Sequence, residues 1–350
     1  MGRWIALGDL LLPVLATLVY ARIGPRFVRE SAAGRIGTGM LLAMLGFGVV
    51  WIAQLPTGLL GLWWQRHAGV SHVGYVSWAF GNWLGLASTF LVVCLAVLIT
   101  MLLAQRLGDR WWIPGAPVFA ALFLLAAFVQ PLALTDLRSP SAKVPKEIRI
   151  AADAAALQRD AGLPRIPIRI QDVDAQTTAP NAETAGLGPS RKVILWNTLV
   201  DDFSSDSIRV VLAHELAHQA RGHIWKQVAW FALLALPLAW ITARVTRRRG
   251  GLVRPEAVPL GILVFTALSV AILPFQNLVS RHLEAEADWV ALQATRDPAA
   301  ASALFEGFTT KAAADPSPPT WSTVLFGSHP TVVQRIAMVR AWEARSAAKP

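Results

Sequence analysis

The chain has 350 residues, of which 54% are hydrophobic and only 15% are charged, and its net charge is +10. This composition is too apolar for one water-soluble domain of this size and predicts a membrane protein. Because the arginines gather at the ends of apolar segments, we attribute the basic charge to orientation in a membrane and expect no nucleic-acid partner.

Six apolar segments approach the length of about 20 residues that crosses a bilayer as a helix. The first could instead be a signal peptide, but "LVYAR" before residue 22 is a poor cleavage site and Asp9 is unusual in such a peptide, so we favour a retained span. The sequence therefore predicts a mainly α, multi-pass transmembrane protein with spans at about 4–21, 38–62, 82–104, 113–134, 228–243 and 257–279.

Two polar regions interrupt the apolar pattern. The first has the signals of a helix at 142–162, a strand at 166–172, a hairpin formed by "NAETAGLG" and "KVILW", and a long helix from about Ser207. Because the polar regions lie on either side of the last two spans, we expect them to fold together on one membrane face as a small α+β domain. The predicted parts are a membrane region at 1–134, a polar domain at 135–227, a transmembrane hairpin at 228–279 and the rest of the polar domain at 280–350.

The short connections predict the orientation of the chain. Arginines are concentrated in loops 22–37, 105–112 and 244–256, whereas the opposite side has only Arg3 and Arg66 in its short segments. Since positive charge in short loops marks the cytoplasmic side, we expect the polar domain outside the cytoplasm, most simply in a cell membrane. Six basic residues near the membrane ends of the polar domain oppose this asymmetry: Arg138, Lys143, Lys146, Arg149, Arg221 and Lys226.

The stretch "VVLAHELAHQARGH", residues 210–223, contains the pattern HExxH. On a helix, His214 and His218 are about 40° apart and can bind one ion, and Glu215 lies on the adjoining flank. Neutral imidazoles bind Zn²⁺, which activates water, and a neighbouring carboxylate can take the proton of that water during attack on an amide. The alternative is a chance pair of histidines on an ordinary helix. We expect one Zn²⁺ per chain.

A third protein ligand is expected in "SRHLEAEADWVAL", residues 280–292, where Glu284 and Asp288 share one helix face and Glu286 points about 200° away from Glu284. Glu284 could bind zinc while Asp288 accepts a ring N–H from a ligand histidine. The alternative is a solvated acidic face. His223 lies nine residues beyond His214, about 180° around the same helix, so we expect it to face away and to form a helix cap or local hydrogen bonds.

These motifs, with "KVILWNTLV", "PNAETAGLG" and "SHPTVVQRI", resemble the integral-membrane CAAX prenyl protease type 1 family and its bacterial relatives over about residues 50–340. Those proteins are zinc metalloendopeptidases with a zincin-like domain. Ala217 and Ala285 depart from the family's glycine and aromatic residue. The resemblance implies His214, His218 and Glu284 as zinc ligands, Glu215 as general base, Asp288 and Arg335 as supporting residues, His329 as a stabiliser of the tetrahedral intermediate, and Asn181 with Val193 and Leu195 of "KVILW" along the bound substrate.

Together these features predict a membrane-embedded zinc metalloendopeptidase acting on membrane-associated or unfolded polypeptides. A general membrane quality-control protease is the alternative enzyme. A scaffold or transporter with a structural zinc site is less favoured, because such sites are rich in cysteine and Cys94 is the only cysteine and lies inside a span. The eukaryotic members of the family work toward the cytosol, which is opposite to the orientation that the arginines predict.

Overall fold

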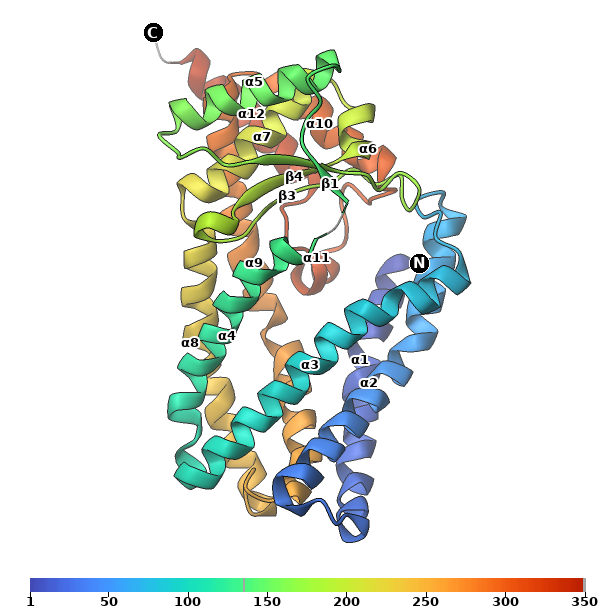
Figure 1. Ribbon diagram of the computed structural model, residues 1–350. Helices are drawn as coiled ribbons and strands as arrows, with labels where there is room; N and C mark the ends of the chain where they lie inside the picture. The colour runs from blue at the N-terminus through green and yellow to red at the C-terminus, as the bar shows by residue number, and fades with distance from the viewer. Residues whose placement is uncertain (135, 349–350) are drawn as a thin grey trace. The chain divides into compact units, whose positions relative to one another are not determined.

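The computed structural model describes residues 1–134 and 136–348, except for the side chains of residues 29, 30, 82–86, 88 and 133. The chain divides into two compact units. The helical unit comprises Met1–Trp64, Val73–Phe123 and Val228–Ile272, and the mixed unit comprises Gln65–His72, Leu124–Gln227 and Leu273–Pro350. Figure 1 labels the elements of both.

Long helices form the helical unit. They are α1 (Gly2–Ile23), α2 (Gly34–His67), α3 (Tyr75–Leu107) and parts of α4 (Trp112–Ala133), α8 (His223–Thr246) and α9 (Val258–Thr295). In the described part of the chain, 6 helical stretches are long and apolar enough to cross a membrane, which confirms the predicted spans. Their bounds are Gly2–Val28, Gly34–His67, Thr89–Arg110, Trp112–Leu132, His223–Arg249 and Pro255–Thr295.

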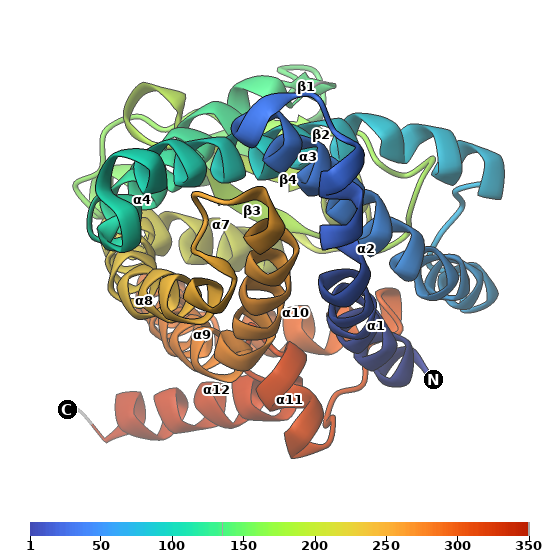
Figure 2. The same cartoon turned by 90° about the horizontal axis from the view of Figure 1, so that it is seen from below.

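The arginine-bearing connections of the helical unit come together at one end of it (Figures 1 and 2). Arg247 Nε lies 2.7 Å from Asp109 Oδ2, and Arg249 Nη1 donates to the Ala21 carbonyl oxygen at 2.7 Å. These contacts join the connection after α8 to the connection after α3 and to the last turn of α1. The short 3-10 helices at this end are η1 (Gly24–Glu30), η2 (Gly108–Arg110), η4 (Arg247–Arg249) and η5 (Pro255–Ala257).

A four-stranded sheet forms the framework of the mixed unit, in the order β1-β2-β4-β3. The strands are β1 (Leu137–Arg138), β2 (Ile168–Gln171), β3 (Ala182–Ala185) and β4 (Lys192–Trp196). β2 and β4 are parallel, whereas β3 and β4 form the predicted antiparallel hairpin, with Ala182 opposite Leu195. A 3-10 turn, η3 (Gly188–Ser190), joins β3 to β4. β1 was not predicted from the sequence, because two residues are too few to show alternation.

Helices cover the sheet and enclose the core of the mixed unit (Figure 1). α7 packs against α5, α10 and β3, and the shared core includes Ile150, Ile170, Leu195, Leu212 and Leu292, each at most 1% exposed. Burial of these apolar side chains is the main force that fixes α7 on the sheet. The helices of this unit besides the ends of α2, α4, α8 and α9 are α5 (Pro145–Asp160), α6 (Asn197–Asp202), α7 (Ser205–Ala220), α10 (Pro298–Lys311), α11 (Thr320–Phe326) and α12 (Val332–Ala347).

Candidate metal centre

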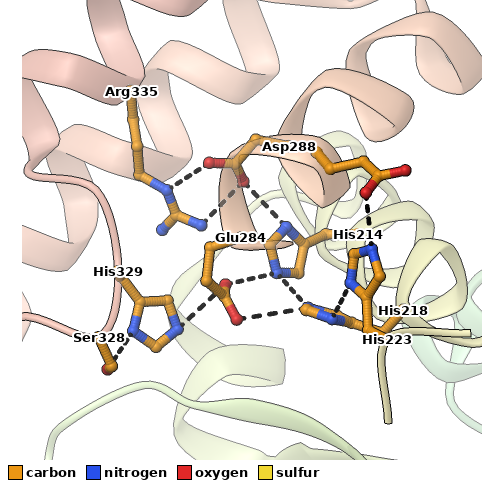
Figure 3. A network of polar contacts seen from close by, with 9 residues as sticks. His214, His218, His223, Glu284, Asp288, Ser328, His329 and Arg335 are labelled. Carbon is orange, nitrogen blue, oxygen red and sulfur yellow. Dashed lines mark hydrogen bonds and ion pairs between the residues drawn. The ribbon is translucent and has the colours of Figure 1, made fainter. Parts of the chain in front are cut away.

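α7 carries the HExxH residues in the middle of the mixed unit. Its N-terminus is fixed by Ser204, whose side chain accepts a hydrogen bond from the Ser207 amide. His214 is 9% exposed and Glu215 is 6% exposed, so this helix presents polar groups inside a packed unit. His214 Nε2 and His218 Nε2 lie 3.0 Å apart (Figure 3). One helical turn separates the two histidines and directs both rings to the same point.

α9 brings a carboxylate to the same point. Glu284 Oε2 lies 3.2 Å from His214 Nε2, and Glu284 Oε1 lies 3.6 Å from His218 Nε2. One ligand atom from each of His214, His218 and Glu284 lies within 4.8 Å of the others. The structure therefore brings together the three residues that the sequence predicts as metal ligands (Figure 3).

The polar atoms at this point suit a cation. Each histidine has its Nδ1 next to another side chain, Asp288 for His214 and His223 for His218, so both Nε2 atoms remain directed toward Glu284. Glu284 Oε2 is buried and has no hydrogen-bond partner among the described residues. Buried polar atoms are nearly always paired, and two imidazole lone pairs facing a carboxylate repel one another unless positive charge lies between them. The donor set therefore fits a metal ion.

A second carboxylate on α9 supports His214 from behind. Asp288 Oδ1 lies 2.9 Å from His214 Nδ1. Arg335, on α12, donates to both carboxylate oxygens, from Nε at 2.7 Å and from Nη2 at 2.8 Å. The Arg335 guanidinium also stacks over the Phe305 ring at 4.5 Å from its centroid. This contact set fixes the orientation of the His214 ring through Asp288.

His329 lies on the other side of Glu284. Its Nε2 is 3.2 Å from Glu284 Oε2 and its Nδ1 is 3.0 Å from Ser328 Oγ, while the side chain is 57% exposed (Figure 3). The segment before it is attached to α9, because Arg281 Nη1 donates to the carbonyl oxygens of Thr323 and Gly327 at 2.9 and 2.6 Å. His329 is thus a solvent-accessible imidazole next to the candidate metal ligands.

The enclosed position of these groups changes their pKa values. Burial raises the pKa of Glu215 to about 7, and the negative charges of Glu284 and Glu183 add to this effect while His214 opposes it. Burial lowers the pKa of His218 to about 3. Burial also disfavours charge on His214, but without a metal ion the neighbouring carboxylates of Asp288 and Glu284 outweigh that cost and raise its pKa to about 10. Glu215 can therefore both accept and release a proton near neutral pH.

The sequence interpretation of His223 was wrong in its geometry. Gly222 has a φ of 61° and ends α7, so His223 is the first residue of α8 and not a continuation of the HExxH helix. Its Nδ1 lies 2.8 Å from His218 Nδ1, so it contacts the His218 ring on the side away from the Nε2 atom that is directed toward Glu284. Glu286 does point away from Glu284, as the helix period predicts, and contacts His223 and Lys226.

The substrate strand predicted from "KVILW" also requires a correction. β4 is an inner strand, hydrogen-bonded on one side to β2 and on the other to β3, so its backbone cannot accept a further strand. Val193 and Leu195 are 0% exposed and belong to the core. β3 ends the sheet in the described part of the chain. Asn181, which precedes β3, is exposed, and its carbonyl oxygen accepts a hydrogen bond from Trp196.

Comparisons with known proteins agree with this geometry. The profile of peptidase family M48 matches residues 145–343. The chain is 25% identical over 295 residues to the uncharacterized metalloprotease YhfN of Bacillus subtilis, covering 81% of this chain and 69% of that protein. It is 24% identical over 240 residues to CAAX prenyl protease 1 of Saccharomyces cerevisiae, covering 62% of this chain and 51% of the relative. The chain thus spans about half the length of the yeast protein.

A solved structure shares the fold. The crystal structure of S. mikatae Ste24p superposes with a TM-score of 0.72 at 19% sequence identity, over 86% of this chain and 75% of that one. The family match extends over more than half of the sequence and contains the HExxH residues and Glu284. The resemblance inferred from the motifs is confirmed: this chain belongs to peptidase family M48 and is a multi-pass membrane metalloprotease.

Proposed function

We propose that this chain is a zinc metalloendopeptidase that hydrolyses peptide bonds in membrane-associated or unfolded polypeptides, with one Zn²⁺ per chain held by His214, His218 and Glu284. The observation that carries the proposal is the convergence of three ligand atoms within 4.8 Å. Two imidazoles and a carboxylate that leave one position open form the donor set of catalytic zinc sites rather than structural ones.

Each neighbouring side chain has a chemical task in this proposal. Zinc at such a site polarises the scissile carbonyl and makes water more acidic. Glu215 accepts the proton of the attacking water and gives it to the leaving amine. His329 donates from its exposed ring to the oxyanion of the tetrahedral intermediate, a charge that an imidazole N–H stabilises. Asp288, paired with Arg335, keeps the His214 ring oriented.

The substrate backbone is proposed to add to the free edge of β3 rather than to β4. An extended peptide can extend a sheet by main-chain hydrogen bonds to an end strand. β3 precedes the turn to β4, and the backbone of Thr184 in β3 forms a hydrogen bond with Glu215. A peptide on this edge would therefore pass close to the general base. Asn181, exposed at the start of the edge, is proposed to bind the same peptide.

The decisive test replaces Glu215 with glutamine. Glu215→Gln keeps the size of the side chain but removes proton transfer, so zinc content should remain at one per chain while hydrolysis of an unfolded membrane-protein substrate falls at least 100-fold. Glu306→Gln, which changes an exposed glutamate of α10 in the same unit, is the matched control and should retain wild-type activity. Metal analysis and a cleavage assay on the same preparation measure both quantities. Full activity of Glu215→Gln would remove this residue from the mechanism.

The identity of the substrate can be found with the same variant. Membranes containing Glu215→Gln should accumulate uncleaved polypeptides relative to membranes containing the wild type, and quantitative proteomics would identify them. Accumulation of prenylated proteins would extend to this chain the activity in the name of the yeast relative. Accumulation of unfolded integral membrane proteins would favour the quality-control alternative.

The polar domain is proposed to lie outside the cytoplasm, with the protein in the cell membrane. Three arginine-rich connections gather at one end of the helical unit, and such clusters mark the cytoplasmic side. α8 and α9 each run from the mixed unit to this end, because the connection between them contains η4 and η5. The other ends of both helices, where His223 of α8 and Glu284 of α9 are attached, then belong to the opposite side.

A further inference from the structure

His218 has a chain of polar side chains behind it that the proposed hydrolysis does not use. His223 Nδ1 lies 2.8 Å from His218 Nδ1, and His223 Nε2 lies 3.3 Å from Glu286 Oε2. His223 is only 1% exposed. A buried imidazole with both nitrogen atoms next to polar partners is held in one orientation, because turning the ring would leave two polar atoms unpaired.

The contacts decide which nitrogen carries each hydrogen. His218 directs Nε2 toward His214 and Glu284, so a neutral ring that offers this lone pair to a metal must carry its hydrogen on Nδ1. His223 Nδ1 then accepts that hydrogen bond. The hydrogen of His223 is consequently on Nε2 and is donated to Glu286. One carboxylate thereby sets the tautomers of two rings.

Glu286 is itself fixed by positive charge. Lys226 Nζ donates to its Oε2 at 2.9 Å, and Arg221 Nε lies 3.6 Å from its Oε1. Lys226 and His223 lie on α8 and Arg221 lies at the end of α7, so three residues around the α7–α8 junction meet one carboxylate of α9. An ionised carboxylate can only accept hydrogen bonds, which makes Glu286 a suitable end for the chain.

The two proposed ligand histidines are therefore supported in parallel. The Nδ1 atom of His214 contacts Asp288, a carboxylate that is paired with the cation of Arg335. The Nδ1 atom of His218 contacts the imidazole of His223, which in turn contacts a pair of the same kind, Glu286 with Lys226. We propose that His223 is a positioning residue that holds the His218 ring and fixes its tautomer, with Glu286 fixing His223 in turn, and that neither is a metal ligand. This inference rests on the proposed function, since it needs His218 to bind metal.

Zinc affinity provides the first test. Purified full-length His223→Ala, titrated with zinc against a chelator of known affinity, should still bind one Zn²⁺ but with affinity reduced about 10- to 100-fold, as is typical when the partner of a ligand histidine is removed. His223→Asn should recover part of this loss, because its side-chain oxygen lies near the position of Nδ1 and can accept from His218. Glu286→Ala should weaken binding less than His223→Ala. The double variant should be no worse than His223→Ala alone, because both residues act through one chain.

A spectroscopic readout separates positioning from general stability. With Co²⁺ replacing zinc, the d–d absorption of His223→Ala should shift at unchanged stoichiometry, because one imidazole is reoriented. kcat should fall while KM stays within about 2-fold, since the substrate edge is not touched. The matched control is His282→Ala, which removes an exposed histidine of α9 two residues from Glu284 and should leave affinity and spectrum unchanged.

The outcomes distinguish this inference from the proposed function. Wild-type affinity and an unchanged cobalt spectrum in His223→Ala would overturn the inference, and so would loss of zinc at saturating concentration, which would make His223 a ligand. A wild-type protein that binds no zinc, or a His214→Ala variant that binds it normally, would instead overturn the proposed function. If His223→Ala does not fold, Glu286→Ala carries the test, because that side chain is 30% exposed.

Discussion

Three acidic residues within five positions of α9 make three different sets of contacts, and the direction of each side chain around the helix decides which contacts it makes. Glu284 faces His214 and His218, Asp288 lies one turn later behind His214, and Glu286 points to the start of α8. This division could be predicted from sequence, because 100° per residue fixes the relative directions once the segment is helical. Nothing in the spacing identified the partners of Glu286, since these depend on how α8 begins.

Glu284 and Asp288 should respond differently to alanine. Glu284→Ala removes a proposed ligand and should abolish both tight zinc binding and hydrolysis. Asp288→Ala removes only the partner of His214 Nδ1 and should reduce zinc affinity about 10- to 100-fold without preventing saturation. Chelator competition and a cleavage assay check both, with Glu343→Ala on the exposed side of α12 as the control. Normal zinc binding by Glu284→Ala would mean that another carboxylate is the third ligand.

Arg335 should matter for stability as well as for the metal. Asp288 is 2% exposed in its side chain and Arg335 is 13% exposed, so truncation of the arginine leaves a buried carboxylate without its guanidinium partner. Loss of one partner of a buried ion pair costs about 3–5 kcal/mol, and Arg335→Ala should lower the unfolding free energy of the metal-free protein by roughly that amount.

The control for Arg335→Ala is a substitution that breaks an ion pair at the surface. Arg149 pairs with Asp206, both about half exposed, and exposed pairs contribute about 0–1 kcal/mol. Arg149→Ala should therefore change the denaturation midpoint only slightly in the same measurement. Equal shifts of the denaturation midpoint for Arg149→Ala and Arg335→Ala would show that burial does not determine how much the Arg335–Asp288 pair stabilises the protein.

At the scale of elements, the junction between α7 and α8 explains the one misplaced histidine. The helical pattern continues through residues 210–223 in sequence, so angular spacing counted from His214 put His223 on the far side. A single glycine, Gly222, ends the first helix in a left-handed conformation, and angles can no longer be counted across it. Gly222 itself was the signal in the sequence that could have indicated the helix end, because glycine commonly follows the last turn of a helix.

The turn between β3 and β4 offers a prediction about the proposed substrate edge. Gly186 has a φ of 90°, and a Cβ there would lie 2.5 Å from the Ser190 carbonyl oxygen. Gly186→Ala should therefore distort the hairpin, raise KM for a peptide substrate at least several-fold and lower the thermal midpoint. Gly188 in the same turn also has a positive φ, 54°, but a Cβ there meets nothing within 4 Å.

Gly188→Ala is accordingly the matched control for Gly186→Ala. It adds only the conformational cost of a left-handed alanine, about 1 kcal/mol, and should leave KM near the wild-type value. Steady-state kinetics and thermal unfolding of both variants separate strain from steric overlap. If the two substitutions change KM and the thermal midpoint equally, steric overlap with Ser190 is not the cause of the change.

At the scale of the whole molecule, length and hydropathy were sufficient to predict the membrane-spanning helices. Each predicted apolar segment overlaps one of α1, α2, α3, α4, α8 and α9. The division into units was harder to predict, because α2, α4, α8 and α9 contribute residues to both units. The sheet order was also beyond the sequence pattern, since alternation identifies strands but not their neighbours, and β4 was therefore placed at an edge that belongs to β3.

The orientation of the molecule gives a prediction that a single fusion can check. If the three arginine-rich connections set the topology, a fluorescent protein that matures only in the cytoplasm and is attached after the last residue should remain dark. The same reporter inserted in the connection between α8 and α9 should be bright and serves as the control for expression. A bright C-terminal fusion with a dark inserted one would reverse the proposed orientation.

The position of Glu284 along α9 bears on which peptide bond of a substrate is cleaved. Between Glu256 and Arg281 this helix has no charged residue, and Glu284 follows Arg281 by three positions. At 1.5 Å per residue, the carboxylate proposed to bind the metal is attached only about 5 Å along the helix axis beyond the first charge after the apolar stretch. If Arg281 marks the edge of the hydrocarbon layer, the proposed ligand is attached about one helical turn beyond that edge. Depth relative to the bilayer, rather than a recognised sequence, would then select the peptide bond that reaches the site.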